Sequence, residues 1–271
     1  MKKPDSVKYK HKNGEYKFLL YEKLGSIVKI TFNRPKEKNA FSLELYSEVK
    51  WALVEAQMDS ESQVVILTGA GDSFGSGGDL KEVLGYHTSK KGWIGAQLFM
   101  EASSGLFRQI AEHDKIIISM VNGPALAAGL VVCEYSDIVI ASEKAWFQSA
   151  SALVGIADSY SSVRLPSLVG LARAKYILLS GARIDAYEAE KWGLVVKVVP
   201  HDQLWPSTLE VANQVMQTGP NLKKIIKHIV HGTLPKIISK PVFDTIMSEE
   251  CFRGVDAFAH KRKPKWAPQG K

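Results

Sequence analysis

The sequence contains no long apolar run and almost no cysteine. Among 271 residues, only Cys133 and Cys251 are cysteines, which argues against a disulfide framework or a cysteine-based zinc site and favours a reducing compartment. No apolar run approaches the roughly 18–20 residues that cross a bilayer, so no membrane span is expected. Residues 1–17 are polar and lysine-rich, unlike a secretory signal. We therefore predict an intracellular protein, with the cytoplasm as the simplest location.

The charge of the chain is unbalanced toward the basic side. There are 35 Lys and Arg residues against 28 Asp and Glu residues, a formal net charge of +7. Such a balance indicates a nucleic acid, an anionic membrane surface or a small polyanion as a partner. The lysines cluster at the two ends of the chain, where solvated tails are the simplest interpretation. This distribution disfavours nucleic-acid binding.

Strands and helices alternate along the chain, which predicts an α/β core. Ser42 is placed to cap a following helix, and Gly181 and Gly193 are placed to end two others. A flexible extension is expected over 1–17 and a helical region over 201–271, on either side of a core at 18–200. Alternating or continuous apolar patterns predict strands at 28–32, 64–68, 116–121, 137–141 and 195–199, and helical patterns cover 204–217, 221–231 and a segment running into 258.

Two segments rich in glycine and alanine lie where a strand passes into a helix, at 74–80 and 122–129. Small residues let a ligand atom approach the backbone, and the start of a helix offers unpaired N–H groups. One N–H from each segment could hold a single oxygen that becomes negative during a reaction, and each donor in such an oxyanion hole contributes about 3–4 kcal/mol. Phe74 breaks the dinucleotide-binding fingerprint, and no phosphate-loop motif is present.

The chain resembles the crotonase superfamily (enoyl-CoA hydratase/isomerase family) over residues 18–266. The resemblance implies an α/β fold, the ClpP/crotonase-like spiral of ββα units, with a helical C-terminal trimerisation region. It also implies a homotrimer or a dimer of trimers, an acyl-CoA thioester as ligand, and no cofactor or metal beyond the CoA of the substrate. The motifs that carry it are at 33–42, 64–82, 121–148, 178–199 and 257–266.

The resemblance also implies roles for single residues. Gly78 and Ala128 fall where the family has its two oxyanion-hole donors. Phe258 and Lys261 match residues that reach the CoA of a neighbouring subunit. Because CoA carries several phosphate charges, a basic surface at the mouth of the site accounts for part of the net charge. The expected CoA-binding positions are Arg34, Lys38, Ala40, Gly78, Asp79, Leu80, Lys81, Ala128, Phe258 and Lys261.

The catalytic pattern of a family hydratase is broken in this chain. Its two glutamates fall at Val131 and Ser151; valine carries no proton, and serine is a poor general base without a partner. One acid remains, Asp158, which falls near the late carboxylate of the Δ3,Δ2-enoyl-CoA isomerases and near the nucleophilic aspartate of the 4-chlorobenzoyl-CoA dehalogenases. The plain alternative is that Asp158 caps the next helix.

We predict an enoyl-CoA isomerase-type proton shuttle with Asp158 as acid and base, because a single carboxylate in an apolar pocket can remove a proton and return it elsewhere. The alternatives are a CoA-thioester hydrolase, dehalogenase or decarboxylase, a divergent enoyl-CoA hydratase, and a non-catalytic acyl-CoA or partner-binding module. His228 is a candidate only for the decarboxylase. The other histidines considered are expected at the surface or in loops: His87, His113, His201 and His231.

Overall fold

A six-stranded sheet forms the centre of the computed structural model, which describes residues 16–237 and 239–267. β1 is antiparallel to β2, and the other neighbours pair in parallel. The prediction of a flexible extension over 1–17 lies almost wholly outside the described residues. In sheet order the strands are β1 (Leu19–Leu24), β2 (Ile27–Phe32), β3 (Val64–Gly69), β4 (Ile116–Val121), β6 (Ile138–Ser142) and β9 (Lys197–Val199).

A second, smaller layer of strands runs beside the first. It contains β5 (Ala125–Leu126), β7 (Trp146–Gln148) and β8 (Arg183–Asp185). Single parallel bridges, Phe41 with Gly78 and Gly75 with Ala125, extend this layer toward the N-terminal end of the core. Each turn of the chain thus passes from a strand of the large sheet through the small layer into a helix. This is the spiral of ββα units that the resemblance implies.

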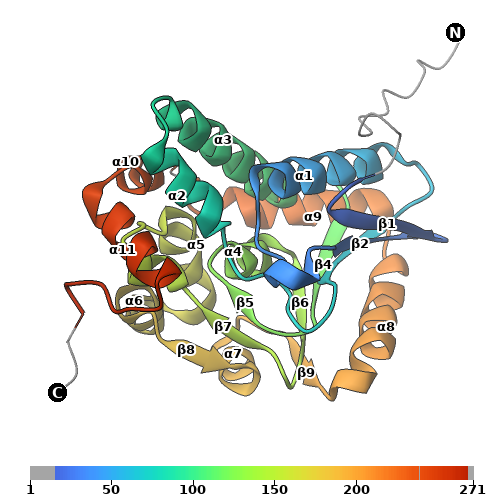
Figure 1. Ribbon diagram of the computed structural model, residues 1–271. Coiled ribbons are helices and arrows are strands. Elements are labelled where there is room, and N and C mark those ends of the chain that lie inside the picture. Colours follow the sequence, from blue (N-terminus) through green and yellow to red (C-terminus); the bar gives the residue numbers. More distant parts are fainter. Residues whose placement is uncertain (1–15, 238, 268–271) are drawn as a thin grey trace, which may run out of the picture.

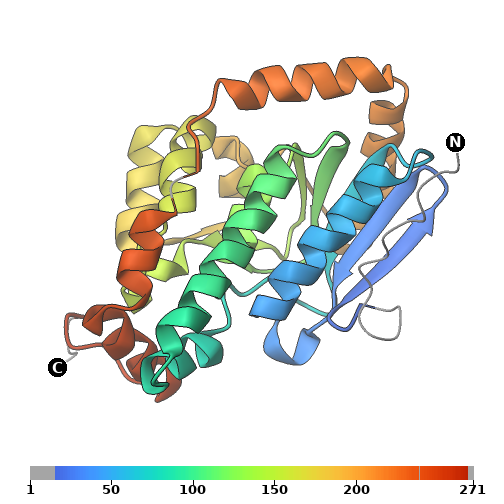
Figure 2. The ribbon, with the colours of Figure 1, turned by 90° about the horizontal axis from the view of Figure 1, so that it is seen from above.

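The helices surround both layers (Figures 1 and 2). Ser42 caps the first one as predicted, with its Oγ 3.1 Å from the Leu45 nitrogen, and Gly181 and Gly193 end two others in the left-handed conformation. They are α1 (Leu43–Met58), α2 (Leu80–Thr88), α3 (Gly92–Ala111), α4 (Ala128–Tyr135), α5 (Ser159–Val169), α6 (Leu171–Ser180), α7 (Ala186–Trp192), α8 (Leu204–Met216), α9 (Pro220–Gly232), α10 (Lys240–Ile246) and α11 (Glu249–Ala259), with short 3-10 turns η1 (Pro35–Glu37), η2 (Ala150–Val154) and η3 (His201–Gln203).

The central strands are buried on both faces, which explains their continuous apolar runs. On β3, Val65 and Leu67 join the larger apolar cluster with α1 and α3, whereas Val64 and Ile66 join a second cluster with α8. The strands predicted from these runs are confirmed. β1 was not predicted, because it is an edge strand in which only Leu19 is fully buried.

The C-terminal region is helical, as predicted, from α8 to α11. No helix among residues 16–237 and 239–267 is both long and apolar enough to cross a membrane. His113 lies in the loop between α3 and β4, as predicted, but it is completely buried, and its two ring nitrogens lie 3.0 Å from the Leu53 carbonyl oxygen and 3.2 Å from that of Lys115. Burial lowers its pKa to about 4, so this histidine is neutral.

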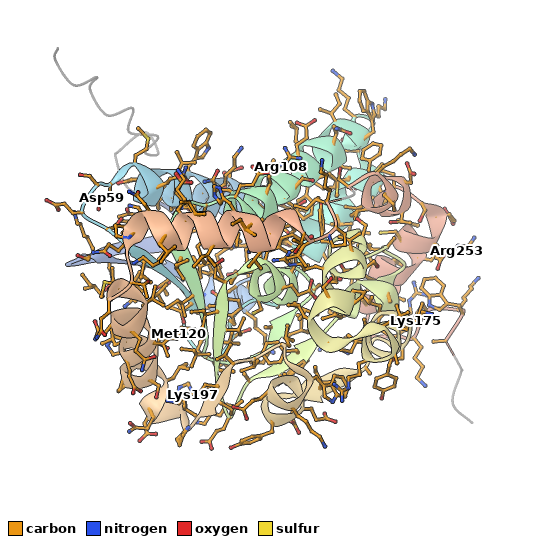
Figure 3. The ribbon with its side chains drawn as sticks, turned by 180° about the vertical axis from the view of Figure 1, so that it is seen from behind. Asp59, Arg108, Met120, Lys175, Lys197 and Arg253 are labelled. Carbon is orange, nitrogen blue, oxygen red and sulfur yellow. The ribbon has the colours of Figure 1, made fainter. Side chains whose placement is uncertain are left out.

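α9 is packed with its basic side inward. Lys227 is buried, and its Nζ lies 2.7 Å from Asp137 Oδ2 and 3.1–3.2 Å from the carbonyl oxygens of Ile110 and Lys115. Lys223 contacts the Val215 carbonyl oxygen in the same way. Figure 3 shows α9 running across the back of the molecule. Buried ammonium groups rather than isoleucines therefore hold this helix to the body.

Removing the buried ammonium should destabilise the fold. We expect Lys227→Met to lower the free energy of unfolding by roughly 3 kcal/mol, because the buried Asp137 would lose its ammonium partner and keep only the Ile117 N–H and His231. Lys224→Met is the matched control: Lys224 forms an exposed pair with Asp114 at 2.8 Å, which is worth about 1 kcal/mol at most. Urea unfolding of both variants measures the difference, and equal losses would contradict the assigned role of Lys227.

Candidate active site

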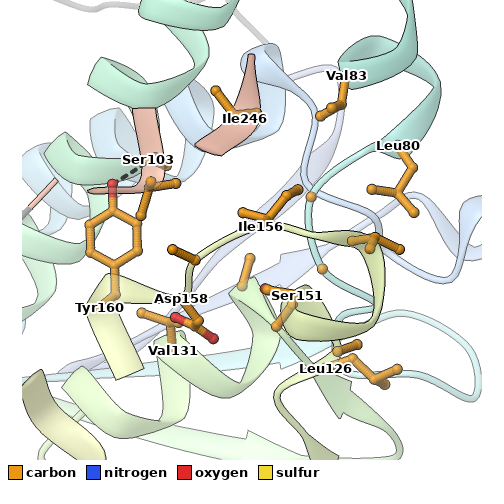
Figure 4. Close-up of a pocket in the computed structure, with 18 of the residues that line it drawn as sticks. Leu80, Val83, Ser103, Leu126, Val131, Ser151, Ile156, Asp158, Tyr160 and Ile246 are labelled. Carbon is orange, nitrogen blue, oxygen red and sulfur yellow. Dashed lines mark hydrogen bonds between the residues drawn. The ribbon is translucent and has the colours of Figure 1, made fainter. Parts of the chain in front are cut away.

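A mostly apolar cavity of about 230 Å³ lies between α1, α2, α3, the start of α4, η2 and α10. Figure 4 shows side chains from several of these elements pointing into it. Its walls carry few polar groups, and all of them come from the segments that the sequence singled out or from helices packed against those segments. The polar lining residues are Tyr46, Ser76, Ser103, Gln148, Ser151, Asp158 and Tyr160.

The two glycine- and alanine-rich segments are joined backbone to backbone. The Leu126 N–H donates to the Gly75 carbonyl oxygen at 2.8 Å, and the Gly75 N–H donates to Pro124 at 3.1 Å. A Cβ on Gly129 would lie 2.4 Å from the Gly75 oxygen, so a side chain at 129 cannot fit unless the backbone moves. The glycines therefore permit the contact that brings both segments to one cavity.

Gly78 and Ala128 both line this cavity. Within the described part of the chain, neither of their amide N–H groups donates a hydrogen bond to a protein acceptor. Ala128 is the first residue of α4, where the partial positive charge of the helix is concentrated. The preceding Ala127 has φ 44° and ψ −111°, an uncommon conformation that costs about 1–3 kcal/mol in a non-glycine residue and often marks a functional site.

Asp158 faces the same cavity and also caps α5. Its Oδ1 accepts a hydrogen bond from the Ser161 N–H at 3.1 Å, and its Oδ2 accepts one from the Ser149 hydroxyl at 2.9 Å. The helix cap is therefore confirmed, and the position of Asp158 at the cavity is compatible with the acid–base role as well. Burial raises the pKa of the Asp158 carboxyl, while the two hydrogen bonds oppose that rise. The carboxyl group is fixed in orientation and is a stronger base than one in water.

The positions of the two absent hydratase glutamates also lie at the cavity. Val131 on α4 and Ser151 on η2 line it beside Asp158 (Figure 4). The cavity therefore contains Asp158 as its carboxylate among the described lining residues. The cavity thus brings together the small-residue segments and one carboxylate, with valine and serine at the two positions where the resemblance implies the glutamates of a hydratase.

Residues 83–112 form the rest of α2 and then α3. α3 closes one side of the cavity with Phe99, Met100 and Phe107. Ser103 on this helix lies 3.2 Å from the Tyr160 hydroxyl, and Ser104 lies 2.8 Å from it. α3 thus forms one wall of the cavity. Tyr160, which lies on α5, contributes a polar group to the cavity and contacts this wall through its hydroxyl.

Four of the expected CoA-binding residues line the cavity, and the others lie outside its lining: the four are Gly78, Leu80, Ala128 and Phe258. The Arg34 guanidinium forms a largely buried ion pair with Asp79 at 2.9 Å and also contacts the Ala40 carbonyl oxygen, so it holds the loop to the start of α2. Lys38 and Lys81 are exposed, and Leu80 lines the cavity. Of the expected cations, Lys38, Lys81 and Lys261 are exposed and therefore accessible to a polyanion.

The C-terminal helices close the cavity of their own chain. Phe258 on α11 lines it, together with Val242 and Ile246 of α10, whereas the resemblance implied a contact with CoA in a neighbouring subunit. Lys261 lies just beyond the end of α11, where it is exposed and its backbone has the left-handed conformation. His228 does not line this cavity and lies 3.5 Å from Asp114, so its candidate role in a decarboxylase gains no support from its position.

One buried acid was missed from the sequence. Glu134 lies on α4, one turn after Val131, and is 1% exposed. Neither of its carboxyl oxygens has a hydrogen-bond partner among the described residues, nor does the buried Ser161 hydroxyl. Burial, and then the nearby charge of Asp158, raise the pKa of Glu134 well above its ordinary value, so it is held protonated. A glutamate within the apolar run LAAGLVVCEY was the available signal.

Comparison with known proteins decides the family. The family model for enoyl-CoA hydratase/isomerase matches residues 22–269. This chain belongs to the enoyl-CoA hydratase/isomerase family. The resemblance and the crotonase fold are therefore confirmed, and the chain is an enzyme of this family.

The relatives include both hydratases and isomerases. The chain is 34% identical over 254 residues to the short-chain enoyl-CoA hydratase of Clostridium acetobutylicum, covering 90% of this chain and 95% of that protein. It is 30% identical over 256 residues to the peroxisomal enoyl-CoA delta isomerase 3 of Mus musculus, covering 93% and 75%. The solved enoyl-CoA hydratase/isomerase of Pseudoalteromonas atlantica T6c is 30% identical with a TM-score of 0.78, covering 93% and 100%.

The protonated state of Glu134 makes stability depend on pH. Because its pKa is higher in the folded than in the unfolded chain, its contribution is complete below the ordinary glutamate pKa of about 4.3 and is lost as the pH rises through the folded value. Glutamine does not ionise. We expect Glu134→Gln to match the wild type in urea unfolding at pH 4.5 and to exceed it increasingly toward pH 8. A constant difference across this range would contradict the assignment.

Proposed function

We propose that this protein is an enoyl-CoA isomerase that moves a double bond along the acyl chain of a CoA thioester. The observation that carries the proposal is the meeting, in one apolar cavity, of two unpaired amide N–H groups and one buried carboxylate, with valine and serine at the hydratase positions. Isomerisation needs one group that takes a proton and gives it back. Water addition usually needs more than one such group.

The thioester oxygen lies between the N–H groups of Gly78 and Ala128 in this mechanism. Asp158 removes a proton from Cα of a Δ3-enoyl thioester, and the electron pair passes to the carbonyl oxygen as an enolate. The same carboxyl group returns the proton at Cγ while the enolate collapses, which leaves a Δ2 double bond. Each amide donor stabilises the enolate by about 3–4 kcal/mol, and burial keeps Asp158 basic enough to act.

The CoA portion is held at the mouth by few charges. Lys38 and Lys81 are accessible to its phosphates, and Phe258 covers the entrance. Ser76 lines the cavity and donates to the Glu37 carbonyl oxygen at 3.2 Å, which joins the lysine-bearing loop to the entrance. The proposed reaction requires no cofactor beyond the CoA of the substrate.

Removing the basic carboxylate tests this mechanism. We expect Asp158→Asn to lower the turnover of a Δ3-enoyl-CoA by a factor of roughly 100 or more, because general acid–base catalysis commonly contributes that much. Binding of the thioester should change little, since the amide donors remain. Turnover is followed by the absorbance of the conjugated product, and binding by calorimetry.

The control for this variant is Asp244→Asn, at an exposed aspartate paired with Lys240. It should retain full activity. Undiminished turnover of Asp158→Asn would refute the role of Asp158. Binding of thioesters without turnover of any by the wild type would instead favour the non-catalytic module, and release of free CoA would favour the hydrolase.

We also propose that the chain assembles as a homotrimer through α9. Its outward face is apolar while its inward face is basic, and a contiguous apolar patch of this kind marks a protein contact. In Figure 2 the helix lies along the outer edge of the molecule, where a second copy has access to it. The exposed residues of this face are Leu222, Ile225, Ile226, Ile229 and Val230.

Charges on this face should prevent assembly. We expect light scattering to give about three times 29.9 kDa for the wild type, and the mass of one chain for Ile226→Glu combined with Ile229→Glu, because carboxylates are costly to bury. Val196→Glu changes an exposed apolar residue elsewhere and should leave the mass unchanged. A wild type that remains a single chain at micromolar concentration would contradict the trimer.

A further inference from the structure

The Tyr46 hydroxyl is a polar group in the cavity that the proposed mechanism does not use. Tyr46 lies on α1, is 3% exposed and lines the cavity. Its ring packs against Phe41, Phe99 and Phe107 at centroid distances of 5.1, 5.2 and 6.1 Å. Within the described residues, no protein group hydrogen-bonds its hydroxyl, and that oxygen is not sealed from the cavity.

The position of this hydroxyl is defined from two sides. A Cβ built on Gly78 would lie 3.9 Å from Tyr46 Oη, which places the hydroxyl near the carbonyl end of a bound acyl chain. On the other side, Asp158 and Tyr160 line the same cavity as Tyr46. Tyr46 Oη therefore borders the space between the proposed oxyanion hole and the basic carboxylate, where the first carbons of the acyl group would lie.

Tyr46 has a proton available to donate, unlike the other hydroxyls near it. Ser103 and Ser104 both donate to the Met100 carbonyl oxygen, at 3.0 and 2.7 Å. The Tyr160 hydroxyl, 2.8 Å from Ser104, can then donate to that serine. Burial raises the pKa of Tyr46 well above its ordinary value, so its hydroxyl keeps the proton at all working pH values.

A purely hydrocarbon acyl chain would leave this donor unpaired once it displaced water from the cavity. A buried polar group without a partner is costly, whereas one that meets an acceptor on the ligand adds specificity. Resting on the thioester site of the proposed function but not on the reaction proposed for it, we propose that the Tyr46 hydroxyl is a substrate-binding group that selects acyl-CoA thioesters with an acceptor oxygen on the acyl chain near the thioester carbonyl.

The test compares two CoA thioesters that differ by one oxygen. Acetoacetyl-CoA and butyryl-CoA have the same number of acyl carbons, and neither is a substrate for double-bond migration. Calorimetric titration of the wild type should show about tenfold tighter binding of acetoacetyl-CoA. In Tyr46→Phe, which loses only the hydroxyl, the dissociation constant for acetoacetyl-CoA should rise about tenfold while that for butyryl-CoA stays the same or falls.

Tyr86→Phe is the matched control, because Tyr86 is a neighbouring half-buried tyrosine that does not line the cavity and whose hydroxyl lies 3.4 Å from Glu82. It should leave both dissociation constants unchanged. If Tyr46→Phe raises the dissociation constants of both esters equally, Tyr46 is a donor to the thioester oxygen and the proposal is overturned. If it changes neither constant, Tyr46 is only a packing residue and the proposal is likewise overturned.

These measurements are independent of catalysis. If the wild type shows the oxygen preference and Tyr46→Phe abolishes it while no Δ3-enoyl-CoA is isomerised, the proposed reaction is wrong and the role of Tyr46 stands. If isomerisation occurs and the preference is absent, the role of Tyr46 is wrong and the reaction stands. If neither ester binds, both are wrong.

Discussion

The site depends on one close contact between two backbones. The chain after β3 and the chain after β4 are hydrogen-bonded through Gly75, Pro124 and Leu126, and Gly129 has no side chain to separate them. Because of this contact, the two free amides at Gly78 and Ala128 open onto one cavity. The uncommon backbone angles of Ala127 are a cost that the surrounding packing offsets. Everything proposed about chemistry in this cavity requires those amides to stay together.

Much of the fold followed from local patterns. Continuous apolar strands such as 64–68 indicated a sheet covered on both faces, and Ser42, Gly181 and Gly193 marked helix ends correctly. Local patterns missed the edge strand β1, and they predicted the helix α9 without showing which of its faces is buried. β1 is an edge strand of mixed polarity. α9 reads as an ordinary amphipathic helix, yet its buried face is the lysine face, because Asp137 and several carbonyl oxygens on other elements accept from it.

The candidate site was predictable only in part. The resemblance located Gly78, Ala128, Val131, Ser151 and Asp158, and the structure brings all five to one cavity. Motifs could not show that Arg34 is engaged with Asp79, that Glu134 is buried without a partner, or that the Tyr46 hydroxyl reaches the cavity. Each of these facts depends on which side chains meet across elements far apart in sequence, and a spacing rule carries no such information.

The central claim is that two backbone amides hold one thioester oxygen. A crystal structure of the protein with a non-reactive acyl-CoA thioester tests it most directly. The account predicts the carbonyl oxygen about 2.7–3.1 Å from both the Gly78 and the Ala128 nitrogen, with Asp158 beside Cα. A thioester whose carbonyl points to solvent, or meets only side-chain donors, would contradict it.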